Sequence, residues 1–206
     1  VRFSAGVVLR FAPGTSLVSY APINVAGTPN APVVFDESVP GRGWGTFAIL
    51  STNASLKPAL SSIQSLVCAN ARGATENGLT FTGGLSCFAS DLRVFQSVFV
   101  SSGQDDALNV KRSRVTIDEC VFINSVADAV DLDWCEASVR RCLFLRSAGD
   151  GIDLSGGKIE IEANVILTAD DKGVSAGERT NVKISRTLLA GCAIGVASKD
   201  GSRVSS

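Results

Sequence analysis

Histidine and methionine are both absent from this sequence, and tyrosine occurs only once. Without histidine a zinc site would need closely spaced cysteines, and Cys135 and Cys142 are too far apart to form a zinc knuckle. The lack of methionine leads us to expect that the chain is a fragment of a longer or processed protein. Charged residues make up only 19% of the chain, no basic block occurs and the net charge is −1, so we expect no nucleic-acid-binding surface.

Long apolar runs and helical patterns are missing as well. No stretch approaches the roughly 20 apolar residues of a membrane-spanning helix, and no signal peptide opens the chain. No window within 104–199 carries the apolar stripe, at spacings of three and four residues, that a long helix needs. The low charge content and the positive mean hydropathy of +0.26 indicate a chain that buries a continuous core rather than a disordered one.

The most informative feature is a repeat in the second half of the chain. Five similar segments begin 22 residues apart, at positions 106, 128, 150, 172 and 194. A fixed period in the twenties is typical of a solenoid, in which each repeat buries its apolar face against its neighbours. Leucine-rich repeats share this period, but their leucine–asparagine pattern is missing here.

Each period predicts three short strands. In the first strand, Val130 and Leu132 alternate with Asp131, so that the apolar residues point inward and the polar residue outward. The second strand is expected at 115–117, 137–139 and 159–161, and then at 182–184 after a slip of one residue. The third is centred on Phe122, Phe144, Ile166 and Leu188. The fold class predicted from this pattern is all-β, a parallel β-helix with about 22 residues per coil.

We expect a single domain over residues 1–206. Its early coils, 1–50, are irregular; the register is lost in an excursion over 51–77, where 56–63 fits either a short helix or a lateral loop; regular coils fill 78–204. No capping helix follows the last coil. Because an uncapped solenoid edge invites further pairing, we expect further coils or a neighbouring domain in the full-length protein.

Two segments carry a family resemblance. Residues 115–122 (VTIDECVF) and 159–166 (IEIEANVI) are similar to the generic repeat of the right-handed parallel β-helix of the pectate-lyase-like superfamily. The resemblance covers roughly residues 5–204. More narrowly, residues 83–204 resemble uncharacterised bacterial β-helix domains, some of them attached to spore-coat-kinase-like proteins. This resemblance implies a right-handed coil and an extracellular or cell-envelope location in a bacterium.

The same resemblance implies an inward ladder. In that superfamily, asparagine often occupies an inward turn and stacks along the helix axis. Asn164 fits this place, Cys120 and Cys142 substitute for asparagine, and Arg186 is expected to break the ladder. Most of the six cysteines are expected to be buried free thiols. A Cys120–Cys142 disulfide stays open, because neighbouring coils lie only about 4.8 Å apart.

Candidate functional residues lie in two outward rows. The first row contains Ser86, Asn109, Asp131, Asp153 and Ser175, and the second contains Phe88, Lys111, Asp133 and Ser155. The three aspartates should stand close together, and like charges at that spacing raise a carboxyl pKa or call for a cation. Hard oxygen ligands suit calcium, which accepts irregular geometry. Asp106, Asp128, Asp150 and Lys172 are expected at the turns that enter these strands.

Three interpretations of these rows remain open. In the first, the turn aspartates bond backbone amides and the outward charges form a solvated face of a structural scaffold. In the second, the outward face binds an extended polysaccharide, with a ligand-binding set of Phe88, Asn109, Asp131, Asp133, Asp153 and Ser155. The third follows from the resemblance to calcium-dependent pectate lyases. There, Asp131, Asp133 and Asp153 would hold calcium, and Lys111, or Lys172, would act as catalytic base on a uronate.

Several gaps weigh against catalysis. Few cationic residues lie near the aspartates to bind the carboxylates of a uronate substrate. A polygalacturonase-type hydrolase is disfavoured too, because its Gly-His-Gly and Arg-Ile-Lys elements are missing, although Asp105 and Asp106 resemble its paired aspartates. We therefore favour a non-catalytic module that serves as scaffold or contacts a glycan, with a calcium-dependent polysaccharide lyase as the alternative. No cofactor other than calcium is indicated.

Overall fold

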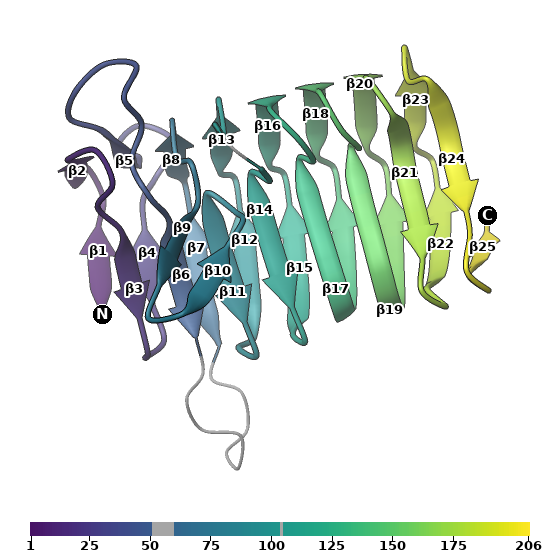
Figure 1. The fold of residues 1–206 in the computed structure, drawn as a ribbon, viewed down its shortest axis with the longest axis horizontal. Coiled ribbons are helices and arrows are strands. Elements are labelled where there is room, and N and C mark those ends of the chain that lie inside the picture. The colour runs from purple at the N-terminus through teal and green to yellow at the C-terminus, as the bar shows by residue number, and fades with distance from the viewer. Residues whose placement is uncertain (51–59, 104) are drawn as a thin grey trace.

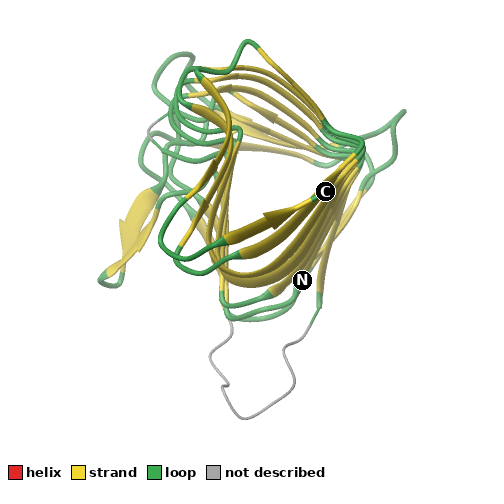
Figure 2. Cartoon of the chain, turned by 90° about the vertical axis from the view of Figure 1, so that its right-hand side faces the viewer, coloured by secondary structure: helices red, strands yellow, loops and turns green. Residues whose placement is uncertain are grey.

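A computed structural model describes residues 1–50, 60–103 and 105–206 of the chain. These residues form strands, turns and loops, without a helix among them, and accordingly none that is long and apolar enough to cross a membrane. The strands stack into a parallel β-helix with three faces, whose coils repeat at 22 or 23 residues in the regular part (Figures 1 and 2). The predicted fold class is confirmed.

Each face is one parallel sheet. The first comprises β3 (Leu17–Ser19), β6 (Phe47–Leu50), β11 (Leu85–Phe88), β14 (Leu108–Lys111), the first parts of β17 (Val130–Arg140) and β19 (Ile152–Glu162), β21 (Lys172–Gly177) and β24 (Ile194–Ser198). The second comprises β1 (Arg2–Ser4), β4 (Asn24–Ala26), β7 (Ser61–Gln64), β12 (Leu92–Phe95), β15 (Arg114–Asp118), the later parts of β17 and β19, β22 (Asn181–Ser185) and β25 (Arg203–Ser205).

The third face is an eight-stranded sheet. Its strands are β2 (Val8–Phe11), β5 (Val33–Glu37), β8 (Leu66–Ala69), β13 (Val98–Val100), β16 (Val121–Ser125), β18 (Leu143–Ser147), β20 (Val165–Ala169) and β23 (Leu188–Ala190). Alternation places every second side chain of these strands inside the coil. The inward side chains stack in register along the axis, as in the rings of Phe99, Phe122 and Phe144, whose centroids are 5.0 Å apart and whose planes are nearly parallel.

Sharp corners connect the three faces. The corner between the first and second faces contains a residue with positive φ in each regular coil: Arg112 (+52°), Trp134 (+50°) and Gly156 (+80°). Equivalent corners occur at Glu119 and Arg141. Since a left-handed residue redirects the chain within one step, each coil turns without a long loop.

An inward ladder runs along the corner between the second and third faces. The amide of Cys142 donates to Asn164 Oδ1 (2.8 Å), and Asn164 Nδ2 donates to the carbonyl oxygen of Val139 (2.9 Å). The Asn164 amide donates in turn to Thr187 Oγ1 (3.4 Å). Arg186 was therefore the wrong residue for this position: the last coil is one residue longer, so Thr187 continues the ladder and Arg186 occupies the positive-φ place before it.

All six cysteines are free, and all but Cys192 are buried. Cys120 and Cys142 stack as predicted, with the Cys120 amide 3.4 Å from Cys142 Sγ, but they are not bonded to each other. Burial raises the pKa of the Cys68 and Cys87 thiols to about 12. The buried cysteines serve as small core residues.

The early coils are more regular than the sequence suggested. The register was expected to be lost over 51–77, but β7 pairs with β12 and β8 pairs with β13, so 61–69 form part of a normal coil. Ile63, expected in a helix or loop, is a fully buried strand residue. The rest of that expectation, over 51–59, lies outside the described residues. What interrupts the period is insertion between strands, including the antiparallel hairpin of β9 (Ala74–Glu76) and β10 (Leu79–Phe81).

This hairpin folds over the outside of the first face. Phe81 from β10 stacks on Phe88 of β11, with ring centroids 5.3 Å apart, and forms a small second core with Ala48 and Leu50. Seen along the stack, the hairpin projects beyond the coil (Figure 2). The outer side of β6 and β11 is therefore covered, while the outer side of β14, β17 and β19 is open.

Candidate functional site

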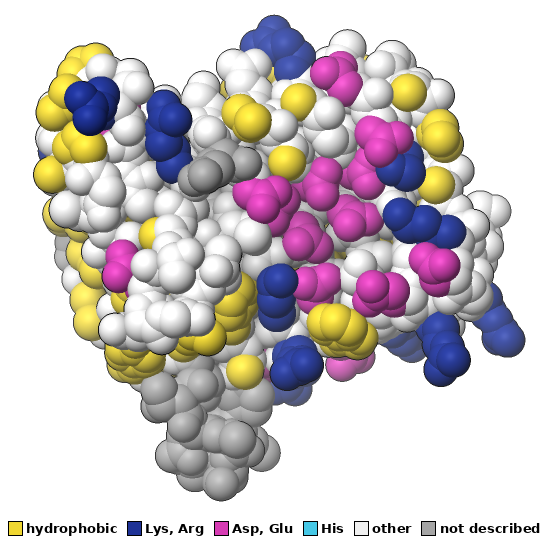
Figure 3. Space-filling view, viewed as in Figure 1, with side chains coloured by type: hydrophobic (Ala, Val, Ile, Leu, Met, Phe, Trp, Pro, Cys, Tyr) yellow, Lys and Arg dark blue, Asp and Glu magenta, His cyan; other side chains and the backbone are white. Residues whose placement is uncertain are grey.

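An acidic patch lies on the open part of the first face. Asn109 pairs with Asp131, Asp131 with Asp153, and Asp153 with Ser175. The predicted stacking is confirmed, and neighbouring rungs of such a ladder are about 4.8 Å apart. In the space-filling view the acidic side chains form a continuous area between the hairpin and the last coils (Figure 3). Below, the acidic face means the outer row from Asn109 to Ser175 together with the turn aspartates beside it.

Asp131 is the most strongly perturbed carboxyl group of this face. Burial, followed by the charges of Asp106, Asp133 and Asp153, raises its pKa from 3.8 to about 9, although Lys111 acts in the opposite direction. Asn109 Nδ2 donates a hydrogen bond to Asp131 Oδ2. At neutral pH Asp131 therefore holds a proton, and the face offers a hydrogen-bond donor there as well as carboxylate acceptors.

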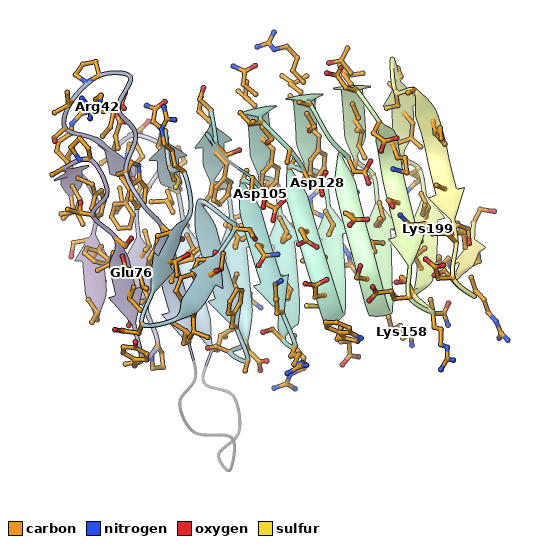
Figure 4. The ribbon with its side chains drawn as sticks, in the orientation of Figure 1. Arg42, Glu76, Asp105, Asp128, Lys158 and Lys199 are labelled. Atoms are coloured by element: carbon orange, nitrogen blue, oxygen red, sulfur yellow. The ribbon has the colours of Figure 1, made fainter. Side chains whose placement is uncertain are left out.

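The turn aspartates form a second row beside the first. Asp128 Oδ1 accepts a hydrogen bond from the Asp150 amide (2.6 Å), and Asp150 Oδ1 accepts one from the Lys172 amide (2.8 Å). For these two residues the predicted bonding to turn backbone is confirmed. Burial raises the pKa of Asp128 to about 6 and, helped by Asp105, that of Asp106 to about 8. Asp105 and Asp128 lie at the same edge of the first sheet (Figure 4).

The carboxylates that come closest together are not the predicted ones. Oxygen atoms of Asp128, Asp150 and Asp153 lie within 4.8 Å of one another, whereas the sequence suggested Asp131, Asp133 and Asp153. Asp131 is instead bonded to Asn109, and Asp133 is paired with a lysine, while the turn places Asp128 and Asp150 beside the row. Such an all-oxygen set suits a hard cation such as calcium. However, Lys172 Nζ is already 3.4 Å from Asp150 Oδ1 and partly neutralises the cluster.

Lys111, the predicted base, is engaged by its neighbours. Its Nζ is 2.9 Å from Asp133 Oδ2 and 5.6 Å from the centre of the Phe88 ring. Burial lowers the pKa of Lys111, but the hydrogen bond and charge of Asp133 outweigh this effect and raise the pKa overall. A protonated lysine cannot accept a proton, so a role as base would require this ion pair to break. Lys172 is held in the same way by Asp171 and Asp150, and its pKa is raised too.

The other predicted ligand residues differ in access. Phe88 is partly buried because Phe81 of the hairpin packs on its ring. Asn109 is fully buried, and its Oδ1 atom has no hydrogen-bond partner among the described residues. Ser155 is half-buried on the rung next to Asp133. Asp131, Asp133 and Asp153 are also half-buried, so their outer edges are the parts of this set that a ligand reaches.

Trp134 was not anticipated as a site residue. Its side chain is 54% exposed at the corner that follows Asp133, and the Arg112 guanidinium lies 5.6 Å from its ring. On the other side, the ring packs against Gly156 of the next coil, where a Cβ atom would come within 2.7 Å of it. The alternation treats position 134 as one more residue of a strand. Only the positive φ of the corner turns this aromatic ring outward beside the acidic face.

The coil architecture defines the class of this protein as a parallel β-solenoid. A family model described as "Right handed beta helix region" matches residues 81–206, and the chain belongs to this right-handed β-helix family. The narrower resemblance to the pectate-lyase-like superfamily stays a prediction, and an association with spore-coat-kinase-like proteins has no support.

One solved structure shows how this fold is used in a larger protein. It is the catalytic unit of a thermostable GH87 alpha-1,3-glucanase from Streptomyces thermodiastaticus strain HF3-3, which superimposes with a TM-score of 0.50 at 15% sequence identity. The match covers 91% of this chain but only 42% of the glucanase unit. At this identity the likeness concerns the fold. No curated protein sequence matches the chain.

Proposed function

We propose that this protein is a non-catalytic β-helix module that contacts a polysaccharide through its acidic face. The observation that carries the proposal is the exposed Trp134 ring next to a row of carboxyl groups one coil apart. Sugar rings pack their apolar faces on aromatic side chains, and their hydroxyl groups bond to carboxylates. Protonated Asp131 and ionised Asp153 together supply a donor and an acceptor at adjacent rungs.

The charge of the face selects among glycans. Aspartates dominate it, and the two nearby lysines are already paired. A polyuronate would be repelled unless a cation intervened, whereas a neutral glycan meets no such penalty. An alpha-1,3-glucan is the first ligand to test, because a protein of similar fold is named as acting on it.

The test is isothermal titration of the protein with alpha-1,3-linked glucose oligosaccharides. We expect Trp134→Ala to weaken binding about tenfold and Asp153→Asn to weaken it less, since the asparagine keeps one acceptor. Leu188→Ala is the matched control, because Leu188 is equally exposed (55%) but lies on the third face. Unchanged affinity in Trp134→Ala would refute a site at this corner.

The alternative is a calcium-dependent lyase acting on uronate glycans. The oxygen cluster of Asp128, Asp150 and Asp153 favours it, since a cation there would offset the repulsion of a uronate. The paired, protonated state of Lys111 opposes it. An absorbance assay for unsaturated uronate products, with calcium and then with chelator, separates the two. Calcium-dependent product that is lost in Asp153→Ala would overturn the non-catalytic proposal.

We further propose an extracellular or cell-envelope location, on the resemblance to secreted bacterial β-helices. Fractionation of the producing cells tests this proposal directly. Recovery of the protein in the cytoplasmic fraction would contradict it.

A further inference from the structure

The outer side of the second face carries a groove that the proposed function does not use. A hollow of about 450 Å³ lies over β12, β15, β17 and β19. A hollow of about 320 Å³ adjoins it at Arg93 and Thr116, and a small one of about 80 Å³ adjoins it at Glu160. The shared residues make these hollows one groove that crosses successive coils along the axis.

Short side chains form the floor of this groove. Arg93 pairs with Thr116, Thr116 with Ser138, and Ser138 with Glu160, so two hydroxyl residues stand between two long charged ones. Ser138 Oγ is shielded from solvent and has no hydrogen-bond partner in the described part of the chain. A buried hydroxyl without a partner costs free energy, which a bound hydrogen-bonding group would recover.

The charges along the groove balance. Three cationic and three acidic residues line the main hollow: Arg93, Arg114 and Lys158, with Asp91, Glu136 and Glu160. Arg114 is fixed by two hydrogen bonds from its guanidinium to Asp91 Oδ2, and its amide donates to Asp91 Oδ1 (3.1 Å). A lining with no net charge favours neither a polyanion nor a polycation.

The backbone here is closed to a peptide strand. Strands β12, β15, β17 and β19 each pair with a neighbour on both sides, so the groove has no free sheet edge to which a peptide could add. Recognition must therefore use side chains, which repeat at every coil. At one end the partly exposed ring of Phe95 stands on the rung between Gln64 and Asp118, and offers an apolar platform beside polar groups.

We propose that this groove binds a neutral linear oligosaccharide, laid along the helix axis across the strands. One sugar ring packs on Phe95, and hydroxyl groups bond to Thr116, Ser138 and the flanking Arg93 and Glu160. Such a site is separate from the acidic face, since it lies on another side of the coil. The ligand belongs to the same chemical class as in the proposed function, but the two sites stand or fall independently.

Binding is tested by titrating the isotope-labelled protein with glucose hexasaccharides, one alpha-1,3-linked and one beta-1,4-linked, and following amide resonances by NMR. Hexagalacturonate is the anionic comparison. We expect shifts in β12, β15 and the later part of β17 with at least one neutral hexasaccharide. Phe95→Ala should weaken this site about tenfold, and Ser138→Val, which fills the notch and removes the hydroxyl, at least as much. Trp134→Ala should leave it unchanged.

Each outcome decides between the two sites. Shifts confined to the first face, with affinity lost only in Trp134→Ala, would overturn the groove and leave the proposed function standing. Shifts confined to the second face would do the reverse. A response to hexagalacturonate alone would overturn the neutral-ligand assignment in the groove. Because the resonance map of the unmodified protein locates the site, a variant that fails to fold leaves the test intact.

Discussion

At the scale of single residues, the acidic face shows how a solenoid perturbs ionisation. Asp131 is flanked by aspartates in its own coil and in the next one, because the period brings like residues to adjacent rungs. Burial adds to this repulsion, and folding therefore raises the pKa of Asp131 far above that of an exposed carboxyl group. Asp106 and Asp128 shift in the same direction.

This shift predicts a pH-dependent stability. The folded state holds the Asp131 proton with a pKa of about 9, against 3.8 for the unreacted model group, so the associated stability is complete below about pH 4 and is lost as the pH rises through 9. We expect Asp131→Asn, which fixes the neutral form, to stabilise the protein at pH 8 by on the order of 1–3 kcal/mol. Urea unfolding at several pH values measures this. Equal pH slopes for the variant and the parent would show that Asp131 ionises freely.

At the scale of strands and turns, the sequence predicted the regular coils because their register is strict. Val130, Ile152 and Val174 pair at intervals of 22, and one inspection of the period places them all. Where a coil contains an insertion the period fails. The pairs Asn24–Ser62 and Leu66–Ser97 belong to coils of unequal length, so β7 and β8 had no repeat to reveal them.

The site was less predictable than the fold, for a similar reason. The alternation assigned Asp131 and Asp153 to the outer row, but it does not describe turns. The approach of Asp128 and Asp150 to Asp153, and the outward ring of Trp134, depend on turn and corner geometry. Contacts of a side chain with the next coil, such as Lys111 with Asp133, are likewise set by rotamers rather than by period.

The corrected ladder gives a prediction at this scale. Replacing Asn164 by alanine removes its bonds to Cys142 and Val139 inside the coil, so we expect a loss of about 2–4 kcal/mol in the free energy of unfolding. Thr187→Val should cost about 1 kcal/mol, because it removes one weaker bond. Arg186→Lys, which keeps charge and corner, is the control and should change little. A larger loss for Arg186→Lys than for Thr187→Val would restore Arg186 to the ladder.

At the scale of the molecule, coils contact only their neighbours. The central coils around β15, β17 and β19 are covered on both sides, whereas apolar residues of β23 and β24, including Leu188 and Ile194, are exposed. In a stack of this kind stability is close to a sum of nearest-neighbour terms. We expect hydrogen-exchange protection, measured by mass spectrometry, to be highest in β17 and β19 and to fall toward both ends. Uniform protection over all coils would mean that the stack opens as one unit.

The hairpin of β9 and β10 gives the acidic face a direction. It covers the outer side of β6 and β11 with a small apolar core, so one end of the face is closed, and the other end continues over β21 and β24. A polymer lying along the axis on this face meets the hairpin at one terminus and leaves the protein at the other. The face is therefore built to hold the end of a chain rather than its middle, and free chain ends would set how many molecules a given mass of glycan can bind.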